Sequence, residues 1–395
     1  MRIGLGRHSI LVAVMAVVMA GLGSAPAVAA TGWTIVPTPN PGTTNLVGGV
    51  VAFGASDVWA VGSASSSSYG GCHGRTLTLR STGAAFSEKP ETPAATPICA
   101  SVDGVAGVTG KDIWAVGSTN NGRDTHLRHW NGSTWTVVPG ATIQLPPSGG
   151  RQQRSTGLNA VATDATDDAW AVGRAQFSDF SRRALAEHWN GSGWSLTSVP
   201  VGTGSVLDGV AIPAADDVWA VGSATSGSNK VTLAVQWDGA AWSIKASPNP
   251  DVLSALHAVA AVPGTNSLWA VGDATRSVTD GVSTMRTLIE FWNGKTWSVV
   301  RSPNVGNGNN SLAAVVATRS DDVWALGYYD DVTGSIPIRK TLALHWNGET
   351  WASVATPNAG TGDNWFTEAA VLAPGGTIWA SGVSAAGTLV EKFTA

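Results

Sequence analysis

Histidine and aspartate are the side chains of this 395-residue chain that recur at regular spacing and could ligate a metal or move a proton. Three histidines, His129, His188 and His345, stand directly before a tryptophan in one recurring phrase. Five aspartates precede the tryptophan of a second recurring phrase, namely Asp57, Asp112, Asp168, Asp217 and Asp322. A residue that recurs at one place in several copies is more typical of packing than of a single reaction centre. We therefore expect the histidines to pack and the aspartates to cap turns between strands.

Motifs that would identify an enzyme are absent from the sequence. There is no D-x-D-x-D-G calcium loop, no Ser-His-Asp spacing, no H-E-x-x-H and no phosphate-binding loop. We accordingly predict no catalytic residue, no metal and no cofactor. Metal ligation by residues from different repeats stays open, because sites in ring-shaped repeat folds assemble across the ring.

The first thirty residues have the composition of a secretory signal peptide. Arg2 and Arg7 precede the apolar run 10–20, and alanine-rich sequence follows through residue 30. This predicts a secreted, extracellular protein that starts near residue 31 and has no membrane span. The net charge of −4, with only 13% charged residues, gives no electrostatic basis for binding nucleic acid.

Cys72 and Cys99 are the two cysteines of the chain, and no C-x-x-C or H-x-x-H spacing accompanies them. In an exported protein, two such cysteines are expected to form one disulfide. Closing a loop of that length contributes roughly 3–4 kcal/mol in the chain-entropy description. A catalytic thiol or a metal pair is the weaker alternative.

The recurring phrases belong to one unit that is copied seven times. The phrase Asp-Val-Trp-Ala-Val-Gly, or a close variant, places Trp at 59, 114, 170, 219, 269, 324 and 379. Trp-Asn-Gly-x-x-Trp, once with Asp for Asn, follows it in five of these units, which we number one to seven in chain order. We expect the tryptophans to be scaffold residues.

Each unit is predicted to contain four short strands. In unit five these are 255–262, 267–272, 287–292 and 296–301, rich in Val, Ile, Leu and Trp and separated by turn residues. Four strands in about 50 residues, repeated seven times, predict an all-β, seven-bladed β-propeller. Its blades are expected at about 45–90, 100–139, 157–200, 204–248, 253–302, 310–356 and 364–393.

The two chain ends are predicted to complete the last blade together. Unit seven stops after its third strand at 388–393. Residues 31–38 carry Trp33, which precedes Pro39 by the interval seen in other fourth strands. We therefore expect 31–38 to lie beside 388–393 and to close the ring, so that 31–395 forms a single domain. Deleting this strand would expose a sheet edge.

This pattern resembles that of the kelch-type, galactose-oxidase-like propellers. The resemblance covers residues 31–395 and rests on an apolar second strand that ends in Gly, such as Ile113–Gly117, and on closure by strands from both chain ends. Kelch repeats end this strand in Gly-Gly, whereas here one Gly is followed by Ser, Arg or Asp. Galactose-oxidase-like enzymes hold copper with two Tyr and two His; this chain has only Tyr69, Tyr328 and Tyr329, so no distant tyrosine pair is obvious. The Asn-Gly-x-x-Trp turn is also similar to the Asp-box of sialidase-type propellers, but it lacks the Ser-x-Asp-x-Gly spacing.

The variable loops identify the face on which a ligand is expected. Loops between strands two and three, and those between units, lie on one face of a propeller and differ in length here, whereas the opposite face carries uniform turns. Both cysteines fall in this loop set. The candidate contact residues on this loop face are Arg174, Asp273, Arg276, Tyr328, Tyr329, Asp330 and Asp331.

The leading hypothesis is a monomeric, non-enzymatic protein that binds an extracellular glycan or protein through the loop face. The alternative is a secreted oxidase or glycan-cleaving enzyme with its site at the mouth of the central channel, supported by fold analogy. A structural or envelope-associated role without a small ligand is a third interpretation. Histidine and carboxylates converging at the channel would favour the enzyme, and aromatic pockets repeated in several blades would favour a lectin-like binder.

Overall fold

The computed structural model describes residues 32–65, 74–81, 83–89, 99–119, 122–143, 153–276, 283–372 and 376–395, without the side chain of Arg276. The chain divides into two units, Met1–Ala30 and Thr31–Ala395, and every described residue belongs to the second. These residues form strands β1 to β28 and no helix, which confirms the all-β class. Accordingly, no helix in the described ranges could cross a membrane.

The strands follow one scheme, in which three consecutive strands of a unit pair antiparallel and a shorter fourth strand adds at the outside. The first strands are β2 (Thr44–Gly54), β6 (Ser101–Thr109), β10 (Gln153–Ala165), β14 (Val206–Ala214), β18 (Leu253–Ala261), β22 (Asn310–Arg319) and β26 (Asn364–Val371). The second strands are β3 (Asp57–Ser65), β7 (Asp112–Thr119), β11 (Asp168–Phe177), β15 (Asp217–Ser226), β19 (Leu268–Arg276), β23 (Asp322–Asp331) and β27 (Ile378–Ser384).

The third and fourth strands complete each sheet. The third strands are β4 (Arg75–Ser81), β8 (Asp124–Trp130), β12 (Arg182–Trp189), β16 (Asn229–Trp237), β20 (Thr284–Trp292), β24 (Ile338–Trp346) and β28 (Gly387–Thr394). The outer strands are β5 (Phe86–Glu88), β9 (Trp135–Val138), β13 (Trp194–Thr197), β17 (Trp242–Lys245), β21 (Trp297–Val299), β25 (Trp351–Val354) and β1 (Gly32–Ile35). Outer strands this short limit the exposed sheet edge.

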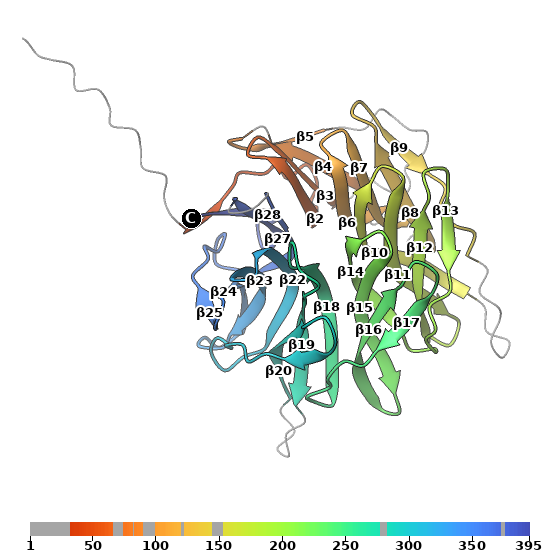
Figure 1. The fold of residues 1–395 in the computed structure, drawn as a ribbon. Helices are drawn as coiled ribbons and strands as arrows, with labels where there is room; N and C mark the ends of the chain where they lie inside the picture. Colours follow the sequence, from red (N-terminus) through yellow and green to blue (C-terminus); the bar gives the residue numbers. More distant parts are fainter. Residues whose placement is uncertain are drawn as a thin grey trace, which may run out of the picture. The chain divides into compact units, whose positions relative to one another are not determined.

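Pairing yields five four-stranded sheets and one eight-stranded sheet among the described residues. The eight-stranded sheet comprises the strands of units four and five, which are joined by one parallel bridge between Lys230 and Leu253. Strand β1 pairs antiparallel with β28, with Trp33 opposite Phe393. The first strands contact one another in chain order from β2 to β26, and β26 also contacts β2 (Figure 1).

The hairpins between third and fourth strands form at the Asn-Gly phrase. In unit two, Trp130 pairs with Trp135 across a four-residue turn, and Asn131 Oδ1 accepts hydrogen bonds from the amides of Ser133 and Thr134. Gly132 has a φ of 91°, whereas Asn131 does not adopt positive φ. The glycine therefore supplies the left-handed conformation, and the asparagine acts through its side chain.

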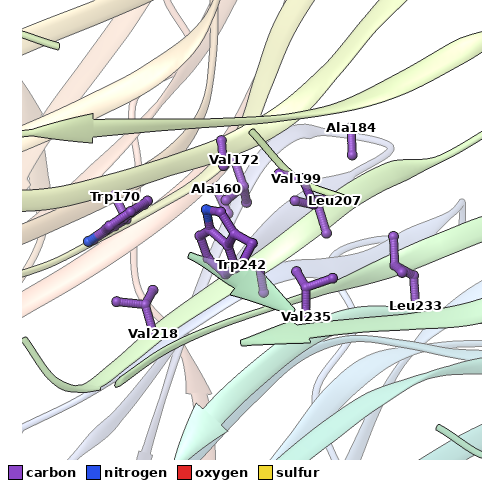
Figure 2. Close-up of a cluster of buried hydrophobic side chains, with 12 residues drawn as sticks. Ala160, Trp170, Val172, Ala184, Val199, Leu207, Val218, Leu233, Val235 and Trp242 are labelled. Carbon is purple, nitrogen blue, oxygen red and sulfur yellow. The ribbon is translucent and has the colours of Figure 1, made fainter. Parts of the chain in front are cut away.

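Tryptophans pack one unit onto the next and form the core. Trp170 of β11 lies 5.2 Å from Trp242 at an interplanar angle of 89° and 5.0 Å from Trp237 of the same neighbouring unit. Figure 2 shows Trp170 and Trp242 among valines, alanines and leucines of units three and four. Because each sheet buries apolar residues against both neighbours, the units stabilise one another rather than folding alone.

The repeated aspartates and histidines bond to each other. His129, His188 and His345 contact Asp112, Asp168 and Asp322 through Nε2 at 2.6, 2.8 and 2.8 Å, and Arg80 and Gln236 occupy the same place in units one and four. The expected packing role of the histidines fits their rings, which lie 4.3–4.5 Å from Trp114, Trp170 and Trp324. The aspartates thus link strand two to strand three. Asp322 also accepts a hydrogen bond from Thr318 Oγ1 across the turn between strands one and two, as expected of a turn cap.

Candidate functional site

A β-bulge occurs at the same place in the first strand of every unit. The register shifts by one residue between Leu158 and Ala160 in β10, and the corresponding shift occurs in the other six first strands. The residues at the bulge are Gly48, Asp103, Asn159, Asp208, His257, Ala313 and Thr367. Bulges re-aim a side chain and are common beside functional sites. Five of these seven residues are polar, within strands that are otherwise mostly apolar.

The single glycine that ends the phrase Asp-Val-Trp-Ala-Val-Gly in strand two is required by the same bulge. Gly173 pairs with Leu158 and Gly272 pairs with Leu256, each directly before a bulge. A Cβ at Gly173 would overlap the carbonyl oxygen of Gly157, and one at Gly272 would overlap that of Ala255. Strand two therefore needs glycine where the bulged first strand approaches it, which explains the recurrence of the phrase in physical terms.

Four of the units join polar side chains into one connected set, which we call the mouth network. Arg174 Nη1 donates to Asn159 Oδ1 at 2.9 Å, and Asn159 Nδ2 donates to Asp208 Oδ1 at 2.9 Å. His257 Nδ1 lies 4.0 Å from Asp208 Oδ2, and its Nε2 lies 2.7 Å from Asp273 Oδ2. Ser311 Oγ donates to the same Asp273 oxygen at 2.9 Å. The network thus runs through units three, four, five and six.

Burial and charge act in opposite directions on the carboxyl groups of this network. Burial raises the pKa of Asp208, although His257, Lys230 and Arg174 oppose the rise. Burial also disfavours charge on Asp273, but hydrogen bonds from His257 and Ser311 hold its pKa below the ordinary value. His257 is therefore placed between an ionised carboxylate and one that is harder to ionise, an arrangement that can exchange a proton.

A cavity of about 190 Å³ lies beside the network and is lined by residues of the first strands of all seven units. Its titratable lining residues are Asp208, His257 and Glu368. Asp103 stands at the equivalent bulge in unit two, and surrounding protein raises its pKa to about 6 even though part of its surface is exposed. No group of three or more His, Cys, Asp or Glu in the described part of the chain is arranged to hold a metal ion.

The structure brings two of the residues singled out from the sequence into one network and places a third, Tyr328, within the electrostatic influence of Asp273. Arg174 and Asp273 belong to the mouth network, and burial raises the pKa of Tyr328, a shift that Arg339 opposes and Asp273 reinforces. The Arg339 guanidinium lies 3.9 Å from the Tyr328 ring centroid and 5.6 Å from that of Trp365.

The other candidates make local contacts or cannot be placed. Tyr329 packs against the core between units five and six. Asp330 accepts from Asn309, and Asp331 pairs with Lys340 at 2.6 Å. The side chain of Arg276 and all of Cys72 lie outside the described residues, so the pairing of Cys72 with Cys99 stays a prediction.

Sequence reasoning missed Asp103, Asn159, Asp208, His257, Ser311 and Glu368. The signal was present, because Leu-Asn-Ala, Leu-Asp-Gly and Leu-His-Ala stand at one place in units three to five. An alignment of the first strands of these units would have revealed a polar residue between a large apolar residue and a small one.

No protein-family model matches the sequence, and no curated protein matches it. Among solved structures, the chain aligns over 94% of its length with 97% of the chain described as YCF48 bound to D1 peptide, with a TM-score of 0.54 and 15% identity. It aligns over 89% of its length with the Hadza microbial sialidase Hz136, with a TM-score of 0.50 and 12% identity, and spans 65% of that chain. The chain has a β-propeller fold. At these identities the likeness concerns the fold alone.

Proposed function

We propose that residues 31–395 form a closed, seven-bladed, kelch-like propeller, in which the eight-stranded sheet is two blades joined at one bridge. Tryptophan packing supports this proposal. Trp59, Trp114, Trp170, Trp219 and Trp269 each pack on two hairpin tryptophans of the following unit. For Trp324 the two places are taken by Phe393 at 4.4 Å and Trp33 at 5.6 Å, one from each end of the chain. Trp379 packs on Phe86 of unit one at 5.9 Å, which supports closure.

We further propose that this propeller is secreted as a monomer and binds an extracellular glycan or protein through its loop face. The observation that carries the proposal is the mouth network, which presents an arginine, an amide, a histidine, carboxylates and a hydroxyl from four successive blades. Arg174 and Asp273 directly follow the strand-two glycines, at the ends of β11 and β19 that lead into the variable loops. Such a mixture of donors and acceptors at the edge of a cavity suits hydroxyl, amide or charged groups of a ligand.

A secreted enzyme remains the second candidate function because a specific observation favours it. His257 lies between Asp208 and Asp273, so histidine and carboxylates converge at the central cavity. A histidine oriented by one carboxylate and close to a second carboxyl group whose pKa is raised is suited to general acid or base catalysis of glycan cleavage. Aromatic pockets repeated from blade to blade would favour a lectin, but the repeat tryptophans of strand two are buried between units and offer no surface to a ligand.

The binding proposal is tested with the purified mature protein on a glycan array and on arrays of extracellular protein segments. Asp208→Asn and Arg174→Gln remove charges from the network, and Glu349→Gln removes one from an exposed hairpin turn as the matched control. We expect a defined ligand whose binding weakens at least tenfold, about 1.4 kcal/mol, in the two network variants and not in the control. Binding that is insensitive to both network variants would refute the site.

The enzymatic alternative is tested on the same proteins with chromogenic glycosides and with peroxide detection for oxidase activity. If the alternative holds, His257→Ala abolishes turnover while the melting temperature stays close to that of the wild type. Turnover that persists in a folded His257→Ala protein contradicts it.

A further inference from the structure

The part of the central cavity wall that unit seven contributes differs from the part that each of the other six units contributes. The residue directly after the bulge is glycine or alanine in units one to six, namely Gly49, Gly104, Ala160, Gly209, Ala258 and Ala314. In unit seven it is Glu368. At Gly209 even a Cβ would lie 2.8 Å from Ala258 Cα, so neighbouring first strands approach closely at this level. A glutamate here places a carboxyl group where the other units provide only backbone and small side chains.

Neighbouring positions change together with Glu368. The residue after it is Ala369, whereas the six other units carry a valine: Val50, Val105, Val161, Val210, Val259 and Val315. These valines and Ala369 line the cavity and form its apolar collar. Opposite Glu368 on β27 stands Ser381, where the other second strands carry Val or Leu. Unit seven thus removes apolar bulk from the collar at the point where it adds a carboxyl group.

Among the described residues, no cationic side chain forms an ion pair with Glu368. The hydrogen bond that its carboxyl accepts comes from its neighbour's amide, Ala369 N, at 3.1 Å to Oε1. Burial raises the pKa of this carboxyl to about 7, and no arginine, lysine or histidine lowers it. Glu290, by contrast, is completely buried between units and accepts from Ser247 at 2.7 Å, so it is sealed from any ligand. Glu368 keeps some exposed surface and lines the cavity.

The cavity has the size for an aliphatic stem, and its lining combines valines with acidic side chains. Its volume of about 190 Å³ is several times the ~30 Å³ that one water occupies in the liquid. The valine collar accommodates a methylene chain. The carboxyl groups of Glu368 and Asp208 line the same cavity, and carboxylates suit a compact ammonium with three donors as well as a planar guanidinium, which needs more room.

We propose that this cavity receives a primary ammonium group on an aliphatic stem, as at the end of a lysine side chain, with Glu368 as its counter-charge. The inference rests on the proposed binding function and specifies its ligand: a protein segment that inserts a lysine beside the mouth network. An amino sugar carries the same ammonium group on a wider ring, and is an outcome that the test distinguishes.

The test measures binding of Nα-acetyl-lysine N-methylamide by calorimetry or NMR titration, beside the uncharged norleucine analogue and glucosamine. We expect the lysine amide to bind at least tenfold more tightly than the norleucine analogue to the wild type. Glu368→Gln should lose this tenfold preference, and Glu349→Gln should keep it. Ala369→Val completes the valine collar. It should weaken binding of the lysine amide at least as much as Glu368→Gln does.

Several results would overturn the inference: no lysine amide binding, equal binding of the norleucine analogue, a preference for glucosamine, or unchanged affinity in folded Glu368→Gln. The comparison of the lysine amide with its norleucine analogue needs only the wild type. It therefore tests the ammonium inference even if the variants fold poorly. If an array ligand still binds in a manner sensitive to Asp208→Asn, only the ammonium inference fails. If no array ligand depends on Asp208 or Arg174, the proposed function fails as well.

Discussion

Glu391 provides a sharp test of how the units pack, because its carboxyl group is buried without compensation. The residue is completely inaccessible to solvent in β28, and neither Oε1 nor Oε2 has a hydrogen-bond partner. Burial raises its pKa from 4.5 to about 8. At the same place in the third strand, units one, four and six carry Leu79, Val235 and Leu344, whereas units two, three and five carry Arg128, Glu187 and Glu290. Glu391→Gln therefore removes an ionisable group from a buried place where neither carboxyl oxygen has a hydrogen-bond partner.

The sign of the effect follows from proton linkage. Below pH 4.5 the carboxyl is protonated in both the folded and the unfolded chain, so its ionisation costs nothing. Between pH 4.5 and about 8 it stays protonated in the folded protein but ionises on unfolding, so stability falls as pH rises. At 1.36 kcal/mol for each pH unit, the loss approaches ~5 kcal/mol above pH 8. For a chain of this length that corresponds to roughly 6 °C in Tm.

The assay is thermal unfolding at pH 5, 6.5 and 8 for the wild type, Glu391→Gln and Glu391→Leu, with Glu349→Gln as the exposed control. We expect Glu391→Gln to match or slightly trail the wild type at pH 5, because a buried amide also lacks partners. At pH 8 it should melt several degrees higher, and Glu391→Leu higher still. Wild-type and Glu391→Gln curves that stay parallel from pH 5 to pH 8 would refute the reasoning.

Two further predictions concern closure of the ring and the cysteines. Trp33→Ala removes the ring that packs on Trp324 and should lower the free energy of unfolding by about 3–5 kcal/mol, measured as a lower Tm. Trp365 lies outside the repeat pattern, so Trp365→Ala should lower stability clearly less. Equal losses of stability in the two variants would contradict the role of β1 in closure. Cys99→Ser should cost roughly 3–4 kcal/mol and leave a Tm that no longer responds to reductant; a wild-type Tm insensitive to reductant would contradict a disulfide with Cys72.

The strands and their packing could be predicted from the sequence because both depend on local and periodic signals. In unit five the expected strands 255–262 and 287–292 correspond to β18 (Leu253–Ala261) and β20 (Thr284–Trp292). The Trp33-to-Pro39 interval also identified the strand that pairs with β28. The phrase of strand two repeats seven times and the hairpin phrase five times, so an ambiguous copy is corrected by the others.

The site could be predicted only in part because it depends on side-chain direction and on contacts between units. Tyr328 and Tyr329 are adjacent in β23, so their side chains point to opposite faces of the strand. Tyr328 meets Arg339 on one face, and Tyr329 packs into the core on the other. Nothing in the sequence of a single loop distinguishes the two. Likewise, His257 meets Asp208 only because neighbouring first strands lie side by side in the fold.

The bulge explains why polar side chains recur at this level of the first strands. A bulged residue leaves the regular pairing of its strand, so its side chain can change without disturbing the hydrogen bonds on either side. Asp103, Asn159, Asp208 and His257 all occupy this place, and the glycine of strand two accommodates the bulge whatever the side chain is. The Trp contacts that hold the units together lie in other parts of the strands. In the proposed function, stability and ligand binding are therefore carried by different positions of one repeat. Substitutions such as Asp208→Asn should then change binding while leaving Tm nearly unchanged.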